Sequence, residues 1–400
     1  MRVGVGYSEN PDTIVAGRQA AESALLELGQ MPCTLVLMFA TARHNAKLLR
    51  KTVAAVVGSN VPIVGGGSVG GISNNQFGYD GDQIILAALA LQDVACDIII
   101  QEKIADNERE AGRSLGKKME AYGIRPESSV MLFYDAINRI KGDVHLTMAS
   151  PLLDGIEQSM GFLPKLIGAG MQGDFLLSST PQWTGAGLGE HTALALSFSG
   201  DIQIDSLIIH GCKPGTGYYT VTKADGQTIL EINNQPALKF VENLLKSSIR
   251  PDDFPFFLIF GVNKGGKWDD FNEEIYASRL CLAIDKERSG IVMFEPDMVV
   301  GTEFQIMYRS LHLDYMPPRI EELFTRLNGR KPVFALYINC AGRAAGYAGK
   351  DLEDAVVVQE TVAGRVPLMG IYTGVEIGLV QGKPRVLDWT GVFCLFSVAA

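Results

Sequence analysis

The feature that most constrains this chain is a glycine-rich loop that recurs along it. The three copies begin at Gly65, Gly168 and Gly370, about 100 and about 200 residues apart. Each copy follows a short apolar segment of the kind that forms a buried strand. Because the predicted strands and helices around the loops also recur in one order, the chain is expected to consist of duplicated structural units.

The predicted order within a unit is strand, helix, strand, helix, strand with glycine loop, and closing strand. Apolar spacing and capping residues define the first unit as strand 3–6, helix 13–28, strand 34–40, helix 42–57 and strand 84–89. The second unit repeats this order with strand 97–102, helix 107–122, strand 130–134, helix 145–161 and strand 192–198. The last unit comprises helix 318–327, strand 333–338, helix 351–364, strand 368–377 and strand 392–398.

The spacing of the loops leaves room for one more unit near residue 270. A degenerate copy is predicted there from helix 236–246 and strands 256–260, 278–284 and 290–294. We therefore expect a mixed α/β (α+β) protein of about four repeated units of roughly 100 residues, in which helices cover mixed β-sheets. The units are expected to form two domains, because Pro/Gly turns and a hairpin signal at residues 224–226 place a boundary near residue 228.

The bulk composition limits the class of function. The 400 residues carry a net charge of −10 and contain no Lys/Arg run, so neither a nucleic acid nor a membrane is expected as a partner. The six cysteines are scattered without metal-ligand spacing, which predicts reduced thiols and no metal site. The first residues lack a signal-peptide pattern and no window has the length of a membrane span, so a cytoplasmic location is expected.

Two of the glycine loops match a dinucleotide-binding fingerprint by letter. Gly65, Gly67 and Gly70 have the required spacing, and so do the glycines that begin at Gly168. The fingerprint also needs a helix that begins at its last glycine and binds the pyrophosphate, and neither following sequence can open a helix. We therefore expect no cofactor. The glycines are expected to allow close backbone approach between units, and amides near Gly65, Ser68 and Gly70 can help to bind a small anion.

The turn after the predicted strand 333–338 carries Asn339, Cys340 and Arg343. A guanidinium in such a turn can clamp a carboxylate with two hydrogen bonds, and the alternative for Arg343 is a structural ion pair with Glu376. Cys340 could act as a nucleophile near a cation. The five histidines offer it no obvious general base, however, and a single cysteine at a strand end is commonly a small buried residue.

The loop predicted to face that turn carries Tyr372, Thr373 and Glu376. Together with Arg343 this segment offers a cation, an anion and an aromatic wall, which is the complement of a zwitterion such as an amino acid. Arg279 lies inside the apolar run YASRLCLAI, and a charge in such a strand is expected to have a partner or a function.

With these segments assembled, the chain resembles FIST-domain proteins, in which a FIST N-type half precedes a FIST C-type half. The resemblance rests on the segment HGCKPGTGYYTVTKADGQTILEINNQPAL, the NCAGR turn, the FPFFLIFGV and YASRLCLAI strands and the closing MGIYTGVEI. It implies a FIST N-type domain over 1–228 with two internal repeats, and a FIST C-type domain over 229–400 with two repeats, the first degenerate. It also implies a sensory domain of signal transduction that binds small ligands such as amino acids.

Two loops depart from the family pattern. The first usually ends in Gly-Glu-Ile but here reads Gly70-Gly71-Ile72, and in the last loop Val375 separates Gly374 from Glu376.

We expect a cytoplasmic small-molecule sensor that is not an enzyme, binds an amino acid or other small carboxylate and relays its state to a signalling partner protein. The alternatives are a thiol-dependent transferase or hydrolase that uses Cys340, and an interaction scaffold without a ligand. The predicted ligand-binding residues are Asn339, Cys340, Arg343, Tyr372, Thr373, Glu376, Arg279, Gly65, Ser68 and Gly70.

Overall fold

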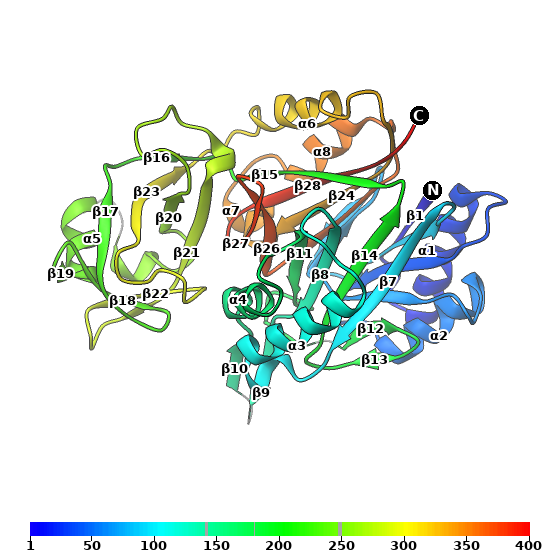
Figure 1. Ribbon diagram of the computed structural model, residues 1–400, viewed down its shortest axis with the longest axis horizontal. Coiled ribbons are helices and arrows are strands. Elements are labelled where there is room, and N and C mark those ends of the chain that lie inside the picture. Colours follow the sequence, from blue (N-terminus) through cyan, green and yellow to red (C-terminus); the bar gives the residue numbers. More distant parts are fainter. Residues whose placement is uncertain (141–142, 180, 247–249) are drawn as a thin grey trace.

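Helices and mixed sheets alternate along the chain in the computed structural model, which describes residues 1–400 except 141–142, 180 and 247–249. Figure 1 shows a large body and a smaller lobe beside it, drawn in green and yellow. The lobe comprises residues 212–309, and the segments before and after it form the body. The predicted mixed α/β class is confirmed.

The first unit of the body has the strand order β1-β6-β2-β3. Its elements are β1 (Arg2–Ser8), α1 (Thr13–Leu28), β2 (Leu35–Ala40), α2 (Ala46–Val57), β3 (Ile63–Gly67) and β6 (Ile84–Ala90). The β2 and β3 strands are parallel, whereas the other neighbours are antiparallel. The Asp12 carboxylate accepts hydrogen bonds from the first amides of α1, and Asn45 caps α2, which therefore begins later than predicted.

Two further units repeat this order. The second contains β7 (Val94–Gln101), α3 (Glu108–Ala121), β8 (Ser129–Asp135), α4 (Ala149–Met160), β11 (Lys165–Met171) and β14 (Ala193–Gly200), with the strand order β7-β14-β8-β11. The third contains β15 (Gln203–Ile209), α6 (Met316–Thr325), β24 (Lys331–Cys340), α8 (Asp354–Val362), β25 (Leu368–Thr373) and β28 (Gly391–Val398), with the order β15-β28-β24-β25. In each unit the second and third strands along the chain are parallel.

A hairpin follows the third strand of each unit and joins the sheet of another unit. We call these the exchange hairpins: β4 (Gly70–Ile72) with β5 (Phe77–Tyr79), β12 (Gln182–Gly185) with β13 (Leu188–Gly189), and β26 (Val375–Val380) with β27 (Lys383–Leu387). The first hairpin pairs with β25 of the third unit, the second with β3 of the first unit, and the third with β11 of the second unit. The three units are therefore linked in a closed cycle.

The glycine loops lie where the exchange hairpins leave their strands. A Cβ atom on Gly65 would lie 2.0 Å from the Met38 carbonyl oxygen, and one on Gly168 would lie 1.8 Å from that of Leu132. Only glycine permits such backbone approach. Gly70 begins strand β4 rather than a helix, so this loop lacks the helix N-terminus of a dinucleotide site.

The three sheets pack on one another through their inner faces. Phe39, Phe133 and Phe334, one from each sheet, lie in a shared core. The outer faces are covered by α1 and α2, by α3 and α4, and by α6 and α8, respectively (Figure 1). A short two-stranded ribbon, β9 (Ile137–Ile140) with β10 (Asp143–Leu146), projects from the second unit.

The lobe interrupts the third unit between β15 and α6. Its elements are β16 (Cys212–Pro214), β17 (Tyr219–Asp225), β18 (Thr228–Ile232), β19 (Gln235–Pro236), α5 (Ala237–Leu245), β20 (Ile259–Asn263), β21 (Tyr276–Asp285), β22 (Gly290–Met293) and β23 (Glu303–Arg309). Because β23 pairs with both β17 and β20, the sheet closes on itself around a separate apolar core.

This lobe occupies the place of the predicted fourth unit, and its architecture differs from that prediction. The predicted strands 278–284 and 290–294 exist as β21 and β22, but they form an antiparallel hairpin inside the closed sheet. Tight turns connect antiparallel neighbours, whereas a copy of the other units would need a helical crossover between parallel strands. The boundary predicted at residue 228 falls in the β17–β18 hairpin, and the division of the chain there stays a prediction.

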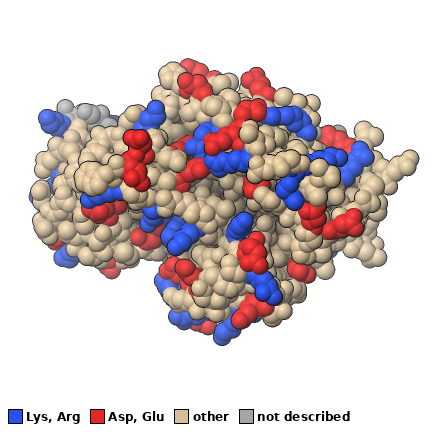
Figure 2. All heavy atoms as spheres, turned by 45° about the horizontal axis from the view of Figure 1, so that its top comes forward, with Lys and Arg blue, Asp and Glu red and all other residues tan. Residues whose placement is uncertain are grey.

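The surface of the body and lobe carries charges of both signs. Figure 2 shows Lys and Arg interspersed with Asp and Glu over one face, without an extended region of one sign. Among the described residues, no helix combines the length and apolar character needed to cross a membrane.

Candidate functional site

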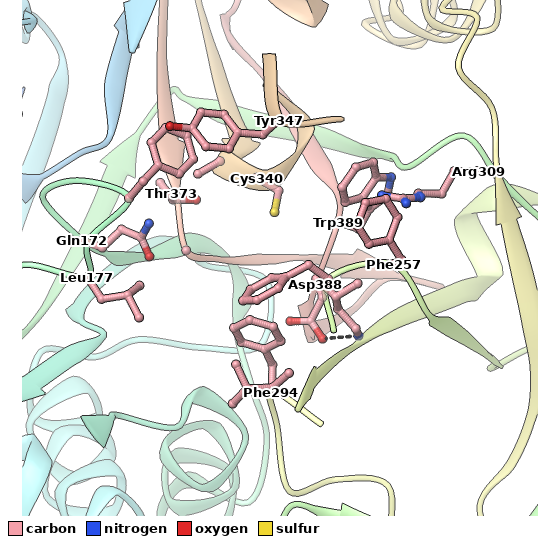
Figure 3. Close-up of a pocket in the computed structure, with 17 residues that line it drawn as sticks. Gln172, Leu177, Phe257, Phe294, Arg309, Cys340, Tyr347, Thr373, Asp388 and Trp389 are labelled. Atoms are coloured by element: carbon pink, nitrogen blue, oxygen red, sulfur yellow. Dashed lines mark hydrogen bonds between the residues drawn. The ribbon is translucent and has the colours of Figure 1, made fainter. Parts of the chain in front are cut away.

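A cavity of about 380 Å³ lies between the lobe and the body (Figure 3). The body contributes Gln172, Phe175, Leu177, Cys340, Ala341, Gly342, Tyr347, Thr373, Gly374, Asp388 and Trp389, and the lobe contributes Phe256, Phe257, Leu280, Leu282, Phe294 and Arg309. Phe256, Phe257 and Tyr347 are each about half exposed, so they form the rim through which the cavity meets solvent.

The exchange hairpins bring the body segments of the cavity together. Cys340 and Thr373 stand at the carboxyl ends of the parallel strands β24 and β25, where ligands bind in many α/β proteins. Gln172 follows β11 of the second unit and reaches the cavity because β26 pairs with β11. Asp388 and Trp389 lie in the turn between β27 and β28.

Aromatic side chains form the walls. Phe175 and Tyr347 are stacked with ring centroids 3.7 Å apart, and Phe256 and Phe294 meet edge to face at 5.8 Å. Tyr347 belongs to the short helix α7 (Ala345–Ala348), which follows the NCAGR turn. Such walls favour a ligand with an apolar or aromatic body.

Arg309 supplies the cation of the cavity. Its guanidinium carbon lies 4.1 Å from the ring centroid of Trp389 and 4.7 Å from that of Phe257, so aromatic rings hold the group. It forms no ion pair with a carboxylate among the described residues, and burial lowers its pKa. A guanidinium with free N–H groups at its edge is suited to bind a carboxylate.

Asp388 supplies an anion. The residue is only 3% exposed, and its Oδ2 atom accepts a hydrogen bond of 2.9 Å from the Leu280 amide. Its Oδ1 atom has no hydrogen-bond partner among the described residues. Burial raises the pKa of Asp388 to about 6, although Arg279 opposes this change. A buried oxygen without a partner is costly, so a ligand donor would relieve that cost.

Two of the ten predicted ligand-binding residues, Cys340 and Thr373, line the cavity. Asn339 and Tyr372 are fully buried beneath it. The Asn339 side-chain oxygen accepts hydrogen bonds from Tyr337 and Arg343, and the Tyr372 hydroxyl donates to Glu353. Tyr372 is therefore part of the core rather than a wall of the cavity.

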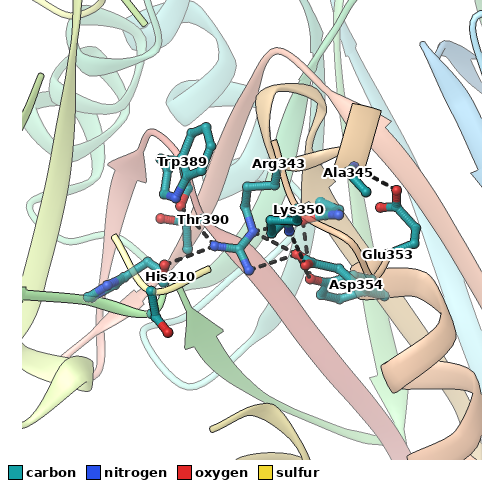
Figure 4. A network of polar contacts seen from close by, with 12 residues as sticks. His210, Arg343, Ala345, Lys350, Glu353, Asp354, Trp389 and Thr390 are labelled. Carbon is teal, nitrogen blue, oxygen red and sulfur yellow. Dashed lines mark hydrogen bonds and ion pairs between the residues drawn. The ribbon is translucent and has the colours of Figure 1, made fainter. Parts of the chain in front are cut away.

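Arg343 is not among the residues that line the cavity and lies in a buried polar network (Figure 4). Its Nη2 atom lies 2.7 Å from an oxygen of Asp354, and Nη1 donates to the His210 carbonyl at 2.9 Å. The predicted alternative for Arg343, a structural ion pair with Glu376, is therefore wrong, because the guanidinium pairs with Asp354 instead. Lys350 also pairs with Asp354, so one carboxylate of α8 balances two buried cations.

Glu376 is buried beneath the cavity beside Asp388. It accepts hydrogen bonds from the Thr373 hydroxyl at 3.1 Å and the Thr390 amide at 3.3 Å. Burial raises its pKa well above the usual range, and the charge of Asp388 raises it further.

The remaining predicted residues lie outside the cavity. Arg279 has the partner expected of a charge in an apolar strand, because its Nε atom donates to Asp297 at 2.7 Å. Ser68 and Gly70 lie where the first and third units cross, and the Ser68 hydroxyl donates to the Tyr372 carbonyl at 3.1 Å. Gly65 lies in β3, opposite Trp183 of the hairpin from the second unit.

Cys340 reaches the cavity with a protonated thiol. Burial raises its pKa well above the ordinary value, and the nearby Glu376 raises it further. The reactive thiolate is thereby disfavoured. Among the described residues, no group of three or more His, Cys, Asp and Glu side chains could hold a metal ion.

The residues predicted from the sequence include neither Arg309 nor Asp388, and none of the aromatic residues that line the cavity. Arg309 ends an alternating strand about 30 residues before the NCAGR turn, and nothing in its spacing indicates the direction of its side chain. Trp389, which follows Asp388 in a turn before the last strand, is the clearest signal that was available, because tryptophan is enriched among residues that contribute most to binding.

Two family models match the segments that supply all of the cavity-lining residues except Asp388 and Trp389, which follow the second match. A family model described as the FIST N domain matches residues 34–235, and one described as the FIST C domain matches residues 237–379. An uncharacterized protein of Mycobacterium tuberculosis is 24% identical over 414 residues, which cover 99% of this chain and 100% of the relative. An uncharacterized protein of Mycobacterium bovis is 28% identical over 196 residues, which cover 48% of this chain and 50% of that relative, so this match spans half of its length.

Among solved structures, PurLQS from Thermotoga maritima aligns with a TM-score of 0.20 and 9% identity, covering 99% of this chain and 72% of that one. A similarity at this level carries no argument about fold or function.

Proposed function

This chain belongs to the FIST family, whose domains are sensory modules for small ligands in signal transduction, and on that premise we propose that its ligand binds between the lobe and the body. The proposed ligand is an amino acid or another small carboxylate with an apolar body. The observation that carries the proposal is Arg309, an arginine held between two aromatic rings at the cavity without a carboxylate partner among the described residues.

The proposed binding mode follows from the chemistry of the lining. The ligand carboxylate binds the edge of the Arg309 guanidinium, and its apolar body packs on the aromatic walls. Gln172 and Thr373 offer an amide and a hydroxyl for further polar contacts. A zwitterion pocket with a cation and an aromatic wall was predicted from the sequence with Arg343 and Tyr372 in these roles. In the proposed binding mode Arg309 and the lining aromatic residues take them instead.

The proposal includes a relay to a partner protein from a cytoplasmic location. Both the lobe and the body contribute side chains to the cavity, so a bound ligand contacts both of them at once. A change in how firmly the lobe docks is therefore a physical signal that a partner can detect.

The thiol-dependent enzyme has less support than the sensor. Burial and Glu376 disfavour the Cys340 thiolate, and among the described residues that line the cavity none is a histidine that could act as its base. A scaffold without a ligand gives no account of Arg309, which has no carboxylate partner among the described residues, or of Asp388 Oδ1, which has no hydrogen-bond partner among them.

The first prediction tests ligand binding through Arg309. We expect the melting temperature of the full chain to rise saturably with at least one compound in a panel of amino acids and small carboxylates. A ligand at 100 times its Kd stabilises the native state by about 2.7 kcal/mol. R309M should abolish the rise, because it keeps an apolar stem and removes the cation.

R365M is the matched control, because Arg365 also stacks on an aromatic ring, with its guanidinium carbon 3.7 Å from the Phe324 centroid, and does not line the cavity. This variant should keep the ligand-induced rise. A panel without any rise at millimolar concentration would contradict the proposed function.

A further inference from the structure

Asp388 lies on the seam between the lobe and the body and contacts both. It belongs to the turn after β27 in the body, and its Oδ2 atom accepts a hydrogen bond of 2.9 Å from the amide of Leu280 in the lobe strand β21. Its backbone amide donates to the Ser278 carbonyl at 3.2 Å, and the Ser278 hydroxyl donates to its carbonyl. One residue therefore holds β21 through its side chain and its backbone.

The other carboxylate oxygen of Asp388 faces the ligand cavity. Asp388 lines the cavity and is only 3% exposed (Figure 3). Its Oδ1 atom has no hydrogen-bond partner among the described residues. The two oxygens therefore have different roles. Oδ2 accepts a hydrogen bond from the lobe, and Oδ1 can accept one from a ligand.

The charges around Asp388 favour a cationic donor. Arg279 is a cation that lowers the pKa of Asp388, but its guanidinium is already paired with Asp297 and donates to the Val386 carbonyl. Glu376 and Glu295 are further buried acids whose pKa values respond to Asp388. The seam therefore has an excess of acidic groups, and a ligand ammonium would balance it.

We propose that Asp388 couples ligand recognition to lobe docking: a protonated ligand amine binds Oδ1, while Oδ2 and the backbone continue to hold β21. This inference rests on the proposed function, because it assumes that a ligand occupies the cavity. It narrows the ligand from a small carboxylate in general to one that also carries a protonated amine.

Coupling follows because the ligand contacts are complete only when the lobe is docked. Arg309 and the phenylalanine side chains of the lobe form one side of the cavity, and Asp388 forms part of the other. A ligand that binds Arg309 and Asp388 together has a higher affinity for the docked arrangement than for an open one. Such a difference in affinity is what shifts a conformational equilibrium.

The experiment compares three probes that share a ring: L-phenylalanine, 3-phenylpropionate and 2-phenylethylamine. The ring suits the aromatic walls, and the probes carry both charged groups, the carboxylate alone and the amine alone. Calorimetry on the full chain gives each Kd, and hydrogen exchange of the β21 amides reports lobe docking. We expect L-phenylalanine to bind at least tenfold more tightly than 3-phenylpropionate and to slow exchange at Leu280 and its neighbours.

The D388N variant tests the residue itself. Its side-chain oxygen can still accept the Leu280 amide, and its shape matches that of aspartate. We expect D388N to bind L-phenylalanine as weakly as it binds 3-phenylpropionate. L-phenylalanine should then no longer slow hydrogen exchange of the β21 amides. D314N is the control, because Asp314 is an exposed aspartate in the segment that leads from the lobe back to the body, and this variant should behave as the parent chain does.

The possible outcomes separate this inference from the proposed function. Equal affinities of the parent chain for L-phenylalanine and 3-phenylpropionate overturn the role of Asp388 and leave the sensor intact. Selective binding with unchanged exchange in β21 overturns the coupling. Failure of all three probes to bind overturns this inference, whereas only a panel of amino acids and carboxylates without any rise in melting temperature overturns the proposed function. Where D388N does not fold, the parent chain alone decides. Between about pH 7.5 and about pH 5.5 Asp388 becomes protonated while 3-phenylpropionate stays ionised, so only the affinity for the two amines should fall.

Discussion

Arg343 holds the NCAGR turn in place through buried polar contacts. It is 2% exposed and forms its ion pair with Asp354 of α8, and it also donates to the backbone of the segment that enters the lobe at His210. The turn that presents Cys340 and Ala341 to the cavity therefore depends on a buried cation that does not itself line the cavity.

The next prediction concerns this buried pair. R343M leaves Asp354 buried with Lys350 as its remaining cation, and breaking a buried ion pair costs about 3–5 kcal/mol. Chemical denaturation should show a loss of that order in the free energy of unfolding. R365M removes a partly exposed pair with Glu321 and should cost less than about 1 kcal/mol. An R343M variant of unchanged stability that no longer bound any ligand would restore Arg343 to the ligand site.

The sequence located part of the site at the residue scale. It identified the NCAGR turn and the following glycine loop, and Cys340 and Thr373 from these segments do line the cavity. It could not show that Arg343 turns inward, because spacing gives no side-chain direction at an irregular turn. Arg309 escaped notice for the same reason, and Asp388 because its value lies in a contact with Leu280, about 100 residues earlier.

At the scale of elements, the exchange hairpins determine the architecture of the body. Helices such as α1 and α3 were predictable because the caps Asp12 and Asn107 mark where they begin. The hairpins were not, because β4 and β12 are only 3 and 4 residues long and carry glycine where an alternating pattern would be needed. The sequence also gives no sign of which sheet a short strand joins.

A glycine substitution tests the crossing of these elements. G168A should lower the free energy of unfolding by about 1–3 kcal/mol or more, because its Cβ would lie 1.8 Å from the Leu132 carbonyl oxygen of β8. G187A lies in the turn between β12 and β13, where the nearest atom to the added Cβ is 3.7 Å away, and should change stability by less than about 1 kcal/mol. Denaturant titration of both variants measures the difference. Equal free energies of unfolding would show that β11 can move away from β8 without loss of stability.

At the scale of the whole molecule, buried acidic side chains form hydrogen bonds between the lobe and the body. The Glu295 carboxylate of the lobe accepts hydrogen bonds from the Ala149 and Ser150 amides at 3.0 and 2.9 Å, and so caps helix α4, which has no cap from its own chain segment. Burial raises the pKa of Glu295 to about 7. The division of the chain into a three-unit body and an inserted lobe could not be predicted, because the lobe has the length of one repeat.

This raised pKa predicts how stability depends on pH. The native protein holds the Glu295 proton more tightly than the unfolded chain does, so the stabilisation is complete in acid and is lost as the pH rises through about 7. The loss is at most about 3 kcal/mol. Melting temperatures between pH 5.5 and 8.5 should fall more steeply for the parent chain than for E295Q. E303Q, at an exposed ion pair with Lys267, should follow the parent chain. Parallel curves for E295Q and the parent would show that Glu295 stays ionised.

The closed cycle of exchange hairpins also determines the order in which the protein can be completed during synthesis. The β11 strand emerges with one edge open and acquires its neighbour β26 only after about 200 further residues, which takes roughly 10–40 s at the usual rate of translation. The β15 edge waits in the same way for β28. The nascent chain therefore carries exposed, apolar strand edges until its last hairpin arrives, which makes this the period when it is most prone to aggregate and most dependent on chaperones.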